Sequence, residues 1–298
     1  MLKLNQQVRI QVDDVFIQYH IFDVNQPVMV TFSPYSEPIT EEQISSGKSA
    51  WGFELFAKRQ LNVVAFNHIG KNNIFESQIF EAFLVDFGKQ LTLFPSRIGY
   101  GASLGGFAVA LYAKTLGLDR ALLLMPVSTF NQSIAPWEPK TFSHSRGVGL
   151  DASGCTIPLT IIYDPLFVPD KLHKERFASC VKVLTITGVG HRVLRALRDL
   201  NMLSSVVLEY REGDINSDNF YQRTRNRRNL SYYFKHIRTV NTGKLTNKRL
   251  MIIYRHKLAY HLKNLDVNPK KIITKLKVSL SKKVIRLMKI FRLQPLRN

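Results

Sequence analysis

The stretch that decides the fold is Gly99-Tyr100-Gly101-Ala102-Ser103-Leu104-Gly105-Gly106, which stands between a predicted strand and a predicted helix. A serine on so sharp a strand-to-helix turn needs a strained backbone and small neighbours two residues away. Gly101 and Gly105 meet that need and complete a Gly-x-Ser-x-Gly pattern around Ser103. The stretch therefore predicts an exposed nucleophile, with the amide of Leu104 at the positive end of the following helix and able to face an oxyanion.

The same glycines could instead form a plain tight turn or a loop that cradles phosphate. A phosphate loop would carry a Lys-Ser or Lys-Thr pair after its glycines, and this stretch carries none. The order of the surrounding elements favours the nucleophile.

Short β-rich runs alternate with helical patterns over the first two thirds of the chain. The predicted strands are residues 8–12, 15–22, 28–32, 62–66, 97–100, 121–125, 159–163 and 181–187. The predicted helices are residues 49–60, 74–94, 104–116, 170–179 and 193–202. Three strands precede the first helix, and strict alternation after it implies right-handed crossovers in a doubly wound, mostly parallel α/β sheet.

The charge is unevenly distributed along the chain, whose formal net charge is +20. The first 220 residues hold 20 Lys and Arg against 21 Asp and Glu, whereas residues 221–298 hold 22 Lys and Arg and a single acid, Asp266. We expect a catalytic domain over residues 1–215, with a lid-like insertion at 127–156, and a basic α-helical C-terminal region over 216–298.

A serine hydroxyl needs a base, and His191 is the preferred candidate. It follows the last predicted strand in Gly188-Val189-Gly190-His191, where the glycines let the loop fold over the strand end. His173 lies inside a predicted helix beside charged residues, so we expect it to be solvated.

The acid that orients His191 should follow the strand 159–163. Asp164 comes directly after that strand and is the preferred candidate. Asp170, which follows Pro169, is the competitor, but its position is also that of a helix N-cap.

These residues resemble the α/β-hydrolase family, in which an elbow of this kind is followed along the chain by the acid and then the histidine. The resemblance covers residues 8–205 and implies an eight-stranded sheet and a triad of Ser103, His191 and Asp164. We expect no cofactor and no metal. The resemblance also implies a second oxyanion amide from the loop 31–35. Pro34 has no amide to give, so Ser33 or Tyr35 is the expected donor.

Three further residues are candidates for contact with substrate. Trp137 and His144 lie in the insertion, and His68 ends the strand 62–66 at the edge of the sheet where ligands bind. The alternative is that the aromatic residues pin the insertion to the domain and that His68 is a solvated loop residue.

The tail is basic and amphipathic over residues 270–293. Its apolar residues recur every three or four positions at Ile272, Leu276, Leu280, Val284, Leu287 and Phe291. Such a helix favours an anionic membrane surface, with packing on the domain or a partner as the alternative. Nucleic acid is disfavoured because no nucleic-acid-binding module is recognisable.

The two cysteines form no metal or disulfide pattern, and no apolar run of signal-peptide or transmembrane length occurs. We therefore expect a cytoplasmic protein, peripheral on the inner face of the membrane. The expected function is that of a serine hydrolase acting on a small-molecule or glycan carboxylic ester, or of a related acyltransferase. The alternatives are an O-acyltransferase or deacylase of surface glycans and a catalytically silent hydrolase-like adaptor.

Overall fold

The computed structural model describes residues 2–70, 75–138, 149–240 and 246–263. The chain divides into two compact units, Met1–Lys244 and Leu245–Asn298. Each is described by itself.

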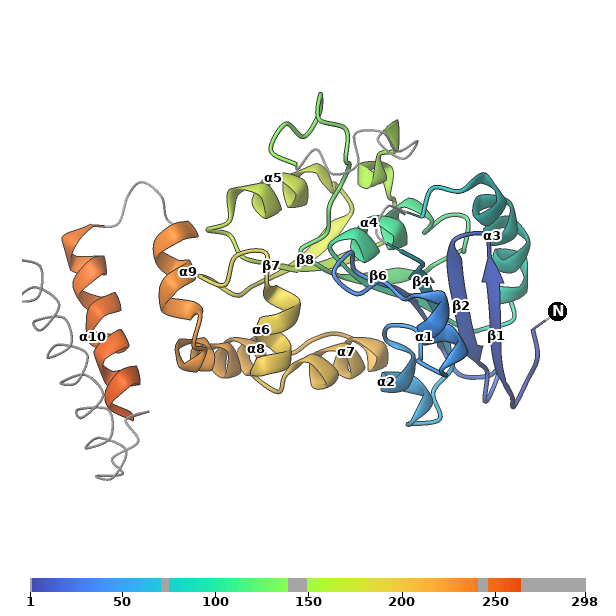
Figure 1. Cartoon of the computed structure of the whole chain (residues 1–298), viewed down its shortest axis with the longest axis horizontal. Helices are drawn as coiled ribbons and strands as arrows, with labels where there is room; N and C mark the ends of the chain where they lie inside the picture. The colour runs from blue at the N-terminus through green and yellow to red at the C-terminus, as the bar shows by residue number, and fades with distance from the viewer. Residues whose placement is uncertain (1, 71–74, 139–148, 241–245, 264–298) are drawn as a thin grey trace, which may run out of the picture. The chain divides into compact units, whose positions relative to one another are not determined.

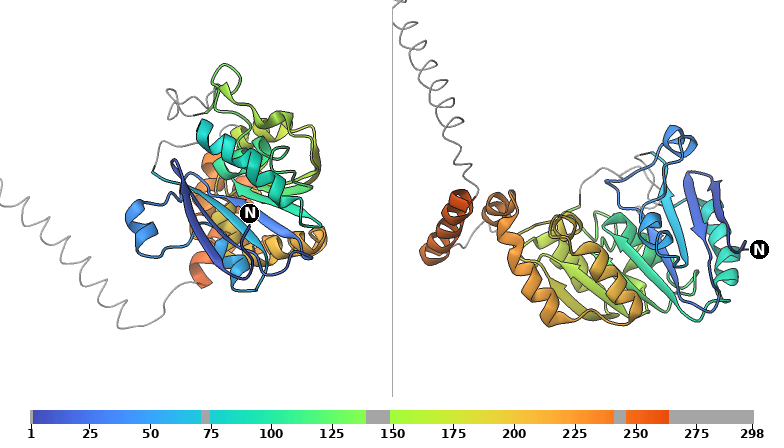
Figure 2. Two further views of the ribbon diagram at one scale, coloured as in Figure 1. Left: turned by 90° about the vertical axis from the view of Figure 1, so that its right-hand side faces the viewer. Right: turned by 90° about the horizontal axis from the view of Figure 1, so that it is seen from below.

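The first unit is built on one eight-stranded sheet with the strand order β1-β2-β4-β3-β5-β6-β7-β8. The strands are β1 (Gln7–Val12), β2 (Val15–His20), β3 (Val28–Phe32), β4 (Val63–His68), β5 (Arg97–Ala102), β6 (Arg120–Leu124), β7 (Leu159–Tyr163) and β8 (Cys180–Thr185). β2 runs antiparallel to β1 and to β4, and all other neighbours are parallel. The predicted α/β sheet is thus confirmed, and Figure 2 shows the N-terminus at its β1 edge.

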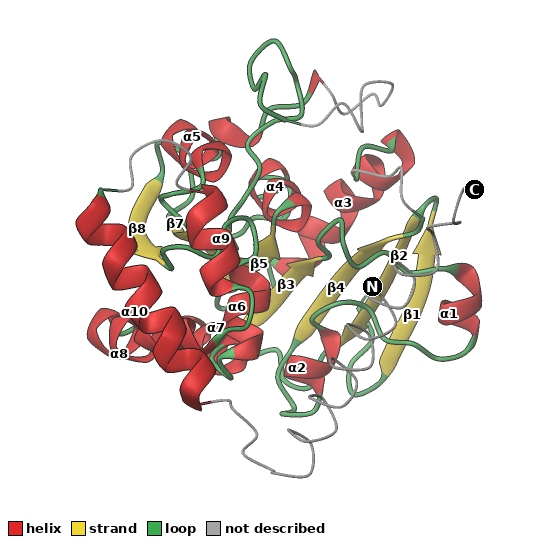
Figure 3. Cartoon of the chain, turned by 60° about the vertical axis from the view of Figure 1, so that its left-hand side comes forward, coloured by secondary structure: helices red, strands yellow, loops and turns green. Residues whose placement is uncertain are grey.

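Helices cover both faces of the sheet (Figure 1). The helices of this unit are α1 (Glu41–Ser45), α2 (Phe53–Ala57), α3 (Gln78–Leu91), α4 (Leu104–Leu111), α5 (Val168–Arg176), α6 (Val193–Asp199), α7 (Leu203–Glu212), α8 (Ser217–Thr224) and α9 (Tyr233–Val240), with short 3₁₀ turns at Ala152–Gly154 and Arg225–Asn229. α3, α4 and α5 lie on one face, and α2, α6 and α7 lie on the other (Figures 1 and 3).

The central strands are apolar runs because helices on both faces exclude water from them. Every residue of β3, β4 and β7 is buried. The edge strand β1 has no buried residue, as expected for a strand with one open side.

The order of the strands reverses at β3, because the chain passes from β3 to β4 on one side and then to β5 on the other. The loops that follow β3 and β5 therefore leave the same edge of the sheet in opposite directions, and such a switch point is where parallel sheets form ligand crevices. Ser103 directly follows β5 at this point.

The first unit extends beyond the expected boundary at residue 215. Phe220 of α8 and Tyr233 and Ile237 of α9 are buried. A Cβ added at Gly188, in the loop before His191, would collide with the side chain of Ile237. α9 therefore backs the loop that carries His191.

The second unit is described only over α10 (Asn247–Lys263) and the residue before it. The amphipathic stretch 270–293 lies outside the described residues, as does His144. Within the part of the chain that the structure describes, no helix combines the length and apolar character needed to cross a membrane.

Candidate active site

Ser103 occupies a strained turn between β5 and α4. Its φ is 53° and its ψ is −115°, a left-handed conformation that costs an L-residue on the order of 1–3 kcal/mol. The serine amide donates to the carbonyl of Leu124 at 2.9 Å, which ties the turn to the end of β6. The sheet thus holds the serine in a conformation that it would not adopt alone.

Glycine is required on both sides of Ser103 because the backbone comes close at both positions. A Cβ at Gly101 would collide with the carbonyl of Gly105, and a Cβ at Gly105 would collide with the carbonyl of Phe32 at the end of β3. The glycine roles predicted from the motif are therefore confirmed by the packing.

His191 reaches Ser103 from the loop after β8. Its Nε2 lies 2.9 Å from the Ser103 Oγ, and its side chain is 37% exposed. Gly188 and Gly190 have φ values of 88° and 64°, which favour glycine and let the loop turn back over the sheet edge. The predicted pairing of Ser103 with His191 is present in the structure.

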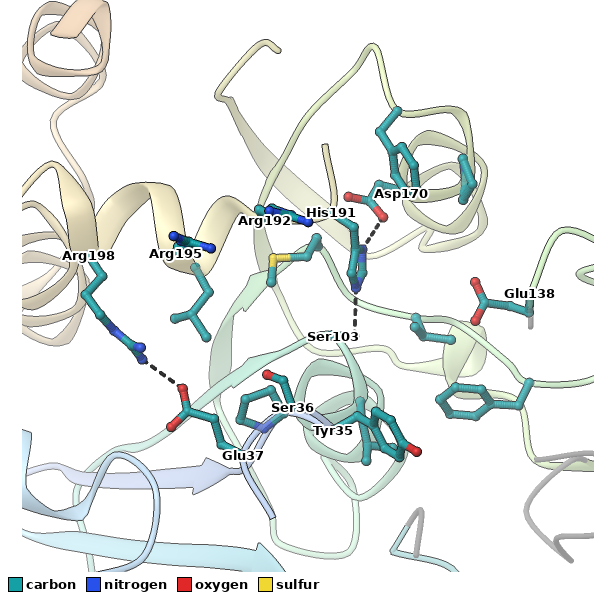
Figure 4. A pocket seen from close by; sticks show the side chains of 18 of the residues that line it. Tyr35, Ser36, Glu37, Ser103, Glu138, Asp170, His191, Arg192, Arg195 and Arg198 are labelled. Carbon is teal, nitrogen blue, oxygen red and sulfur yellow. Dashed lines mark hydrogen bonds and ion pairs between the residues drawn. The ribbon is translucent and has the colours of Figure 1, made fainter. Parts of the chain in front are cut away.

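Asp170, not Asp164, contacts His191. The Asp170 Oδ1 lies 2.6 Å from the His191 Nδ1, and the Asp170 side chain is 2% exposed (Figure 4). The expectation that Asp164 orients His191 is wrong in geometry. Asp170 is also not a helix N-cap, because α5 begins two residues earlier with Phe167 as its cap.

Asp164 holds the histidine loop by its backbone. Its Oδ2 accepts from the amides of Gly188 at 2.8 Å and Gly190 at 2.7 Å, and its Oδ1 accepts from Leu166 at 2.9 Å. The carboxylate is fully buried. Asp164 therefore fixes where His191 sits, while Asp170 fixes how its ring is turned.

The electrostatics favour the protonated imidazole of His191. Burial alone would lower its pKa, but the hydrogen bond and negative charge of Asp170 outweigh burial and raise the pKa above its ordinary value near 6.5. Asp170 therefore stabilises the charged form of His191.

The amide of Leu104 is the first of α4 and lies at the pocket beside Ser103. It remains the predicted oxyanion donor, since the first amides of a helix have no partner inside it. Ser33 does not fit that role, because its amide donates to the carbonyl of Phe66 at 3.0 Å within the sheet. Tyr35 lines the pocket and stays the predicted second donor.

His68 is buried rather than exposed to substrate. Its Nδ1 lies 2.7 Å from the Ser33 Oγ, and its ring packs against Phe75 and Tyr35. Burial lowers the pKa of His68 to about 4 despite a backbone hydrogen bond with Tyr35, so the ring is neutral. The expectation that it contacts substrate is wrong, and its role is to brace the loop after β3.

His173 is also buried, against the expectation of a solvated histidine. Its Nδ1 accepts from the Ser128 amide at 3.1 Å, and its Nε2 lies 2.9 Å from the Glu138 Oε1 and 3.0 Å from the Trp137 Nε1. Because Asp170 precedes it by three residues on α5, the same helix face carries the acid and anchors the start of the insertion. Trp137 lines the pocket and donates to His173 there, and its contact with substrate stays a prediction.

These groups open on one cavity of about 670 Å³. Apolar side chains form much of its wall, namely Leu104, Met125, Val127, Phe130, Trp137, Phe167 and Leu194. Charged side chains that the sequence analysis did not identify line it as well, namely Glu37, Glu138, Arg192, Arg195, Arg198 and Asp199. Arg192 directly follows His191, and Arg195 and Arg198 come after it at intervals of three residues. This spacing by itself also fits the solvated face of an ordinary helix.

In the described residues, no group of three or more His, Cys, Asp or Glu side chains is placed to hold a metal ion.

No protein family model and no curated protein matches the chain. Solved structures do resemble it. Est1E from Butyrivibrio proteoclasticus is 14% identical at a TM-score of 0.48, covering 68% of this chain and 98% of its own. The capsule O-acetyltransferase of Neisseria meningitidis serogroup A is 14% identical at 0.46, covering 76% of this chain and 97% of its own. The carboxylesterase EstE1, cloned from a metagenomic library, is 14% identical at 0.44, with 71% and 89% covered.

At these values the similarities assign no activity to this chain. The fold is defined by its own features: the strand order, the serine elbow after β5, and the acid and histidine carried after β7 and β8. Together they make this an α/β-hydrolase fold.

Replacing Gly105 by alanine tests the close approach of the elbow to β3. Because the new Cβ collides with the backbone carbonyl of Phe32, which cannot rotate away, we expect Gly105→Ala to destabilise the fold by about 1–3 kcal/mol or more. The matched control is Gly154→Ala, where an added Cβ meets nothing within 4 Å. Chemical denaturation measures both; equal stability of the two variants would contradict the packing described.

Proposed function

We propose that the protein is a serine hydrolase or acyltransferase that acts on carboxylic esters or related acyl donors through an acyl-enzyme. The observation that carries the proposal is the hydrogen-bonded series from Ser103 through His191 to Asp170, placed on a strained elbow at the wall of a cavity. Structural serines rarely need a left-handed backbone, so strain at this residue supports a role in chemistry.

In the proposed reaction, the Ser103 Oγ attacks the acyl carbonyl while its proton passes to the His191 Nε2. The Asp170 carboxylate accepts a hydrogen bond from the Nδ1–H of the ring, which keeps its proton, and stabilises the imidazolium. The amide of Leu104 donates to the oxyanion of the tetrahedral intermediate. As the intermediate collapses, His191 returns the proton to the leaving alcohol or thiol, and the acyl group remains as an ester on Ser103.

A second attack completes the cycle. His191 removes a proton from water or from an acceptor hydroxyl, the new oxygen attacks the acyl-serine, and Ser103 regains its proton. Water gives hydrolysis, and a sugar hydroxyl gives O-acylation, so the series of Ser103, His191 and Asp170 is compatible with either outcome.

The apolar wall at Met125, Val127 and Phe130 supports the placement of an acyl chain beside Ser103. Following product formation with water and with sugar hydroxyls as competing acceptors separates the two.

Labelling with a fluorophosphonate probe tests the nucleophile. We expect the wild-type protein to be labelled at Ser103 and Ser103→Ala not to be labelled, because the probe reacts with an activated serine oxygen. Ser36→Ala is the matched control, since Ser36 lines the same pocket. No labelling of the wild type, or equal labelling of Ser103→Ala, would favour a catalytically silent adaptor instead.

The pH profile tests the acid. Because His191 must be neutral to act as the base and Asp170 raises its pKa, kcat/KM should fall as the pH drops through a value above 6.5. Removing the charge in Asp170→Asn lowers the pKa of His191, so this acidic limb should move to lower pH while kcat falls by about 10³–10⁴.

The matched control is Asp164→Asn, which removes the carboxylate from the Gly188 and Gly190 amides. We expect it to lower the free energy of unfolding by about 1–3 kcal/mol without moving the acidic limb. A limb that moves in Asp164→Asn and stays in place in Asp170→Asn would reverse the assignment.

We also propose that residues 270–293 bind an anionic membrane surface. Their apolar stripe and flanking lysines and arginines support this, each basic residue adding about 1 kcal/mol near such a surface. Deleting residues 265–298 should abolish sedimentation with phosphatidylserine-containing liposomes and leave turnover of a small soluble ester. Vesicles of phosphatidylcholine alone are the control. Undiminished binding to the anionic liposomes after deletion would exclude this role.

A further inference from the structure

The cavity that contains Ser103 has a cationic side. Arg192, Arg195 and Arg198 all line it, and Figure 4 shows them in a row that begins beside His191 and ends opposite Glu37. Arg195 and Arg198 lie three residues apart on α6, and Arg192 is the N-cap residue just before this helix. The row therefore starts at the reacting atoms and leads away from them.

Two of these arginines are held by acids but keep donors free for a ligand. Arg198 lies 2.9 Å from Glu37 through one nitrogen, with its side chain 55% exposed. Arg195 lies 3.4 Å from Asp199 through its Nε and stacks over the ring of Tyr232, with its side chain 59% exposed. Since a guanidinium carries five N–H donors, each acid orients its arginine without saturating it.

Arg192 has no acid partner among the described residues. Its neighbour His191 is paired with Asp170, and the pocket acid Glu138 is paired with His173. The acids on the arginine side, Glu37 and Asp199, offset two of the three guanidinium charges. This side of the cavity therefore keeps an excess of positive charge beside the reacting centre. A bound anion would neutralise that excess.

The wall of the cavity thus combines apolar and cationic side chains. Met125, Val127 and Phe130 are suited to an acyl chain, whereas the arginine row is suited to an anion. A guanidinium matches the geometry of phosphate oxygens, which can accept from several arginines together. The side chains of an ordinary solvated helix face need not line a cavity, whereas these three arginines do.

We propose that the substrate of this enzyme carries a phosphate group, and that Arg192, Arg195 and Arg198 bind it while the acyl group contacts the apolar residues of the cavity. This inference rests on the proposed function. It places the phosphate either on the alcohol or thiol that leaves when Ser103 is acylated, or on the acceptor that takes the acyl group from Ser103. Two sources share this chemistry: a phosphopantetheine-type acyl thioester and a phosphorylated sugar ester.

Matched pairs of ligands test the proposal and identify the source. Calorimetry would compare the binding of 4′-phosphopantetheine with pantetheine, and of a hexose 1-phosphate with its methyl hexoside, to the wild-type protein. Steady-state kinetics would compare the acetylated forms of the same four compounds. We expect the phosphorylated member of one pair to bind, and to react in kcat/KM, at least tenfold better, and high salt to reduce that preference.

Substitutions then assign the preference to the arginines. Arg192→Gln and Arg198→Gln should each lower the phosphorylated-to-unphosphorylated ratio by about tenfold, the loss expected for one charged hydrogen-bonding partner at a partly exposed site. Arg59→Gln is the matched control, because Arg59 is exposed and does not line the cavity. It should leave the ratio unchanged.

The outcomes separate this inference from the proposed function. A ratio near one in both pairs, with Ser103 still labelled by the fluorophosphonate, overturns the phosphate site and leaves the serine enzyme. A binding preference that depends on Arg192 and Arg198 supports the site even if Ser103 fails to label. A preference that persists unchanged in both arginine variants also overturns the proposal.

Discussion

The close approach of the serine elbow to the end of β3 is the constraint on which the rest of the structure depends. Because Gly105 packs directly on the carbonyl of Phe32, the turn at Ser103 can be held in a left-handed conformation and still open a helix. That contact exists only at the switch point of the sheet, where the loops after β3 and β5 part. The candidate nucleophile Ser103 and the candidate oxyanion amide of Leu104 thus stand beside one packing contact between two backbone segments.

The two buried aspartates hold His191 in two different ways. Asp164 satisfies the amides of the histidine loop, and Asp170 contacts the imidazole itself. Both contacts are possible because Asp164 directly follows β7 and Asp170 lies in the first turn of α5. A buried carboxylate needs hydrogen-bond donors, and here one set is backbone and the other is a ring nitrogen.

The sequence-based predictions failed where a side chain had two physically reasonable environments. Asp164 and Asp170 both follow β7, and only the direction of α5 shows which of them faces His191. His173 was expected to be solvated because charged residues flank it, and His68 was a candidate for substrate contact, yet tertiary partners bury both. Nothing in the sequence marks Arg192, Arg195 and Arg198 as site residues, and only the cavity shows that they line one. In each case the deciding partner is distant in sequence.

The sequence by itself determined the parallel sheet, the serine elbow and the candidate base. These follow from local rules: apolar runs that alternate with helical periodicity, and glycines that permit a strained turn. Tertiary structure alone decided which acid contacts the histidine, which histidines are buried, how far the first compact unit extends, and which charges line the cavity. The physical reason is that backbone conformation is largely a local property, whereas burial and charge pairing depend on what the fold brings alongside.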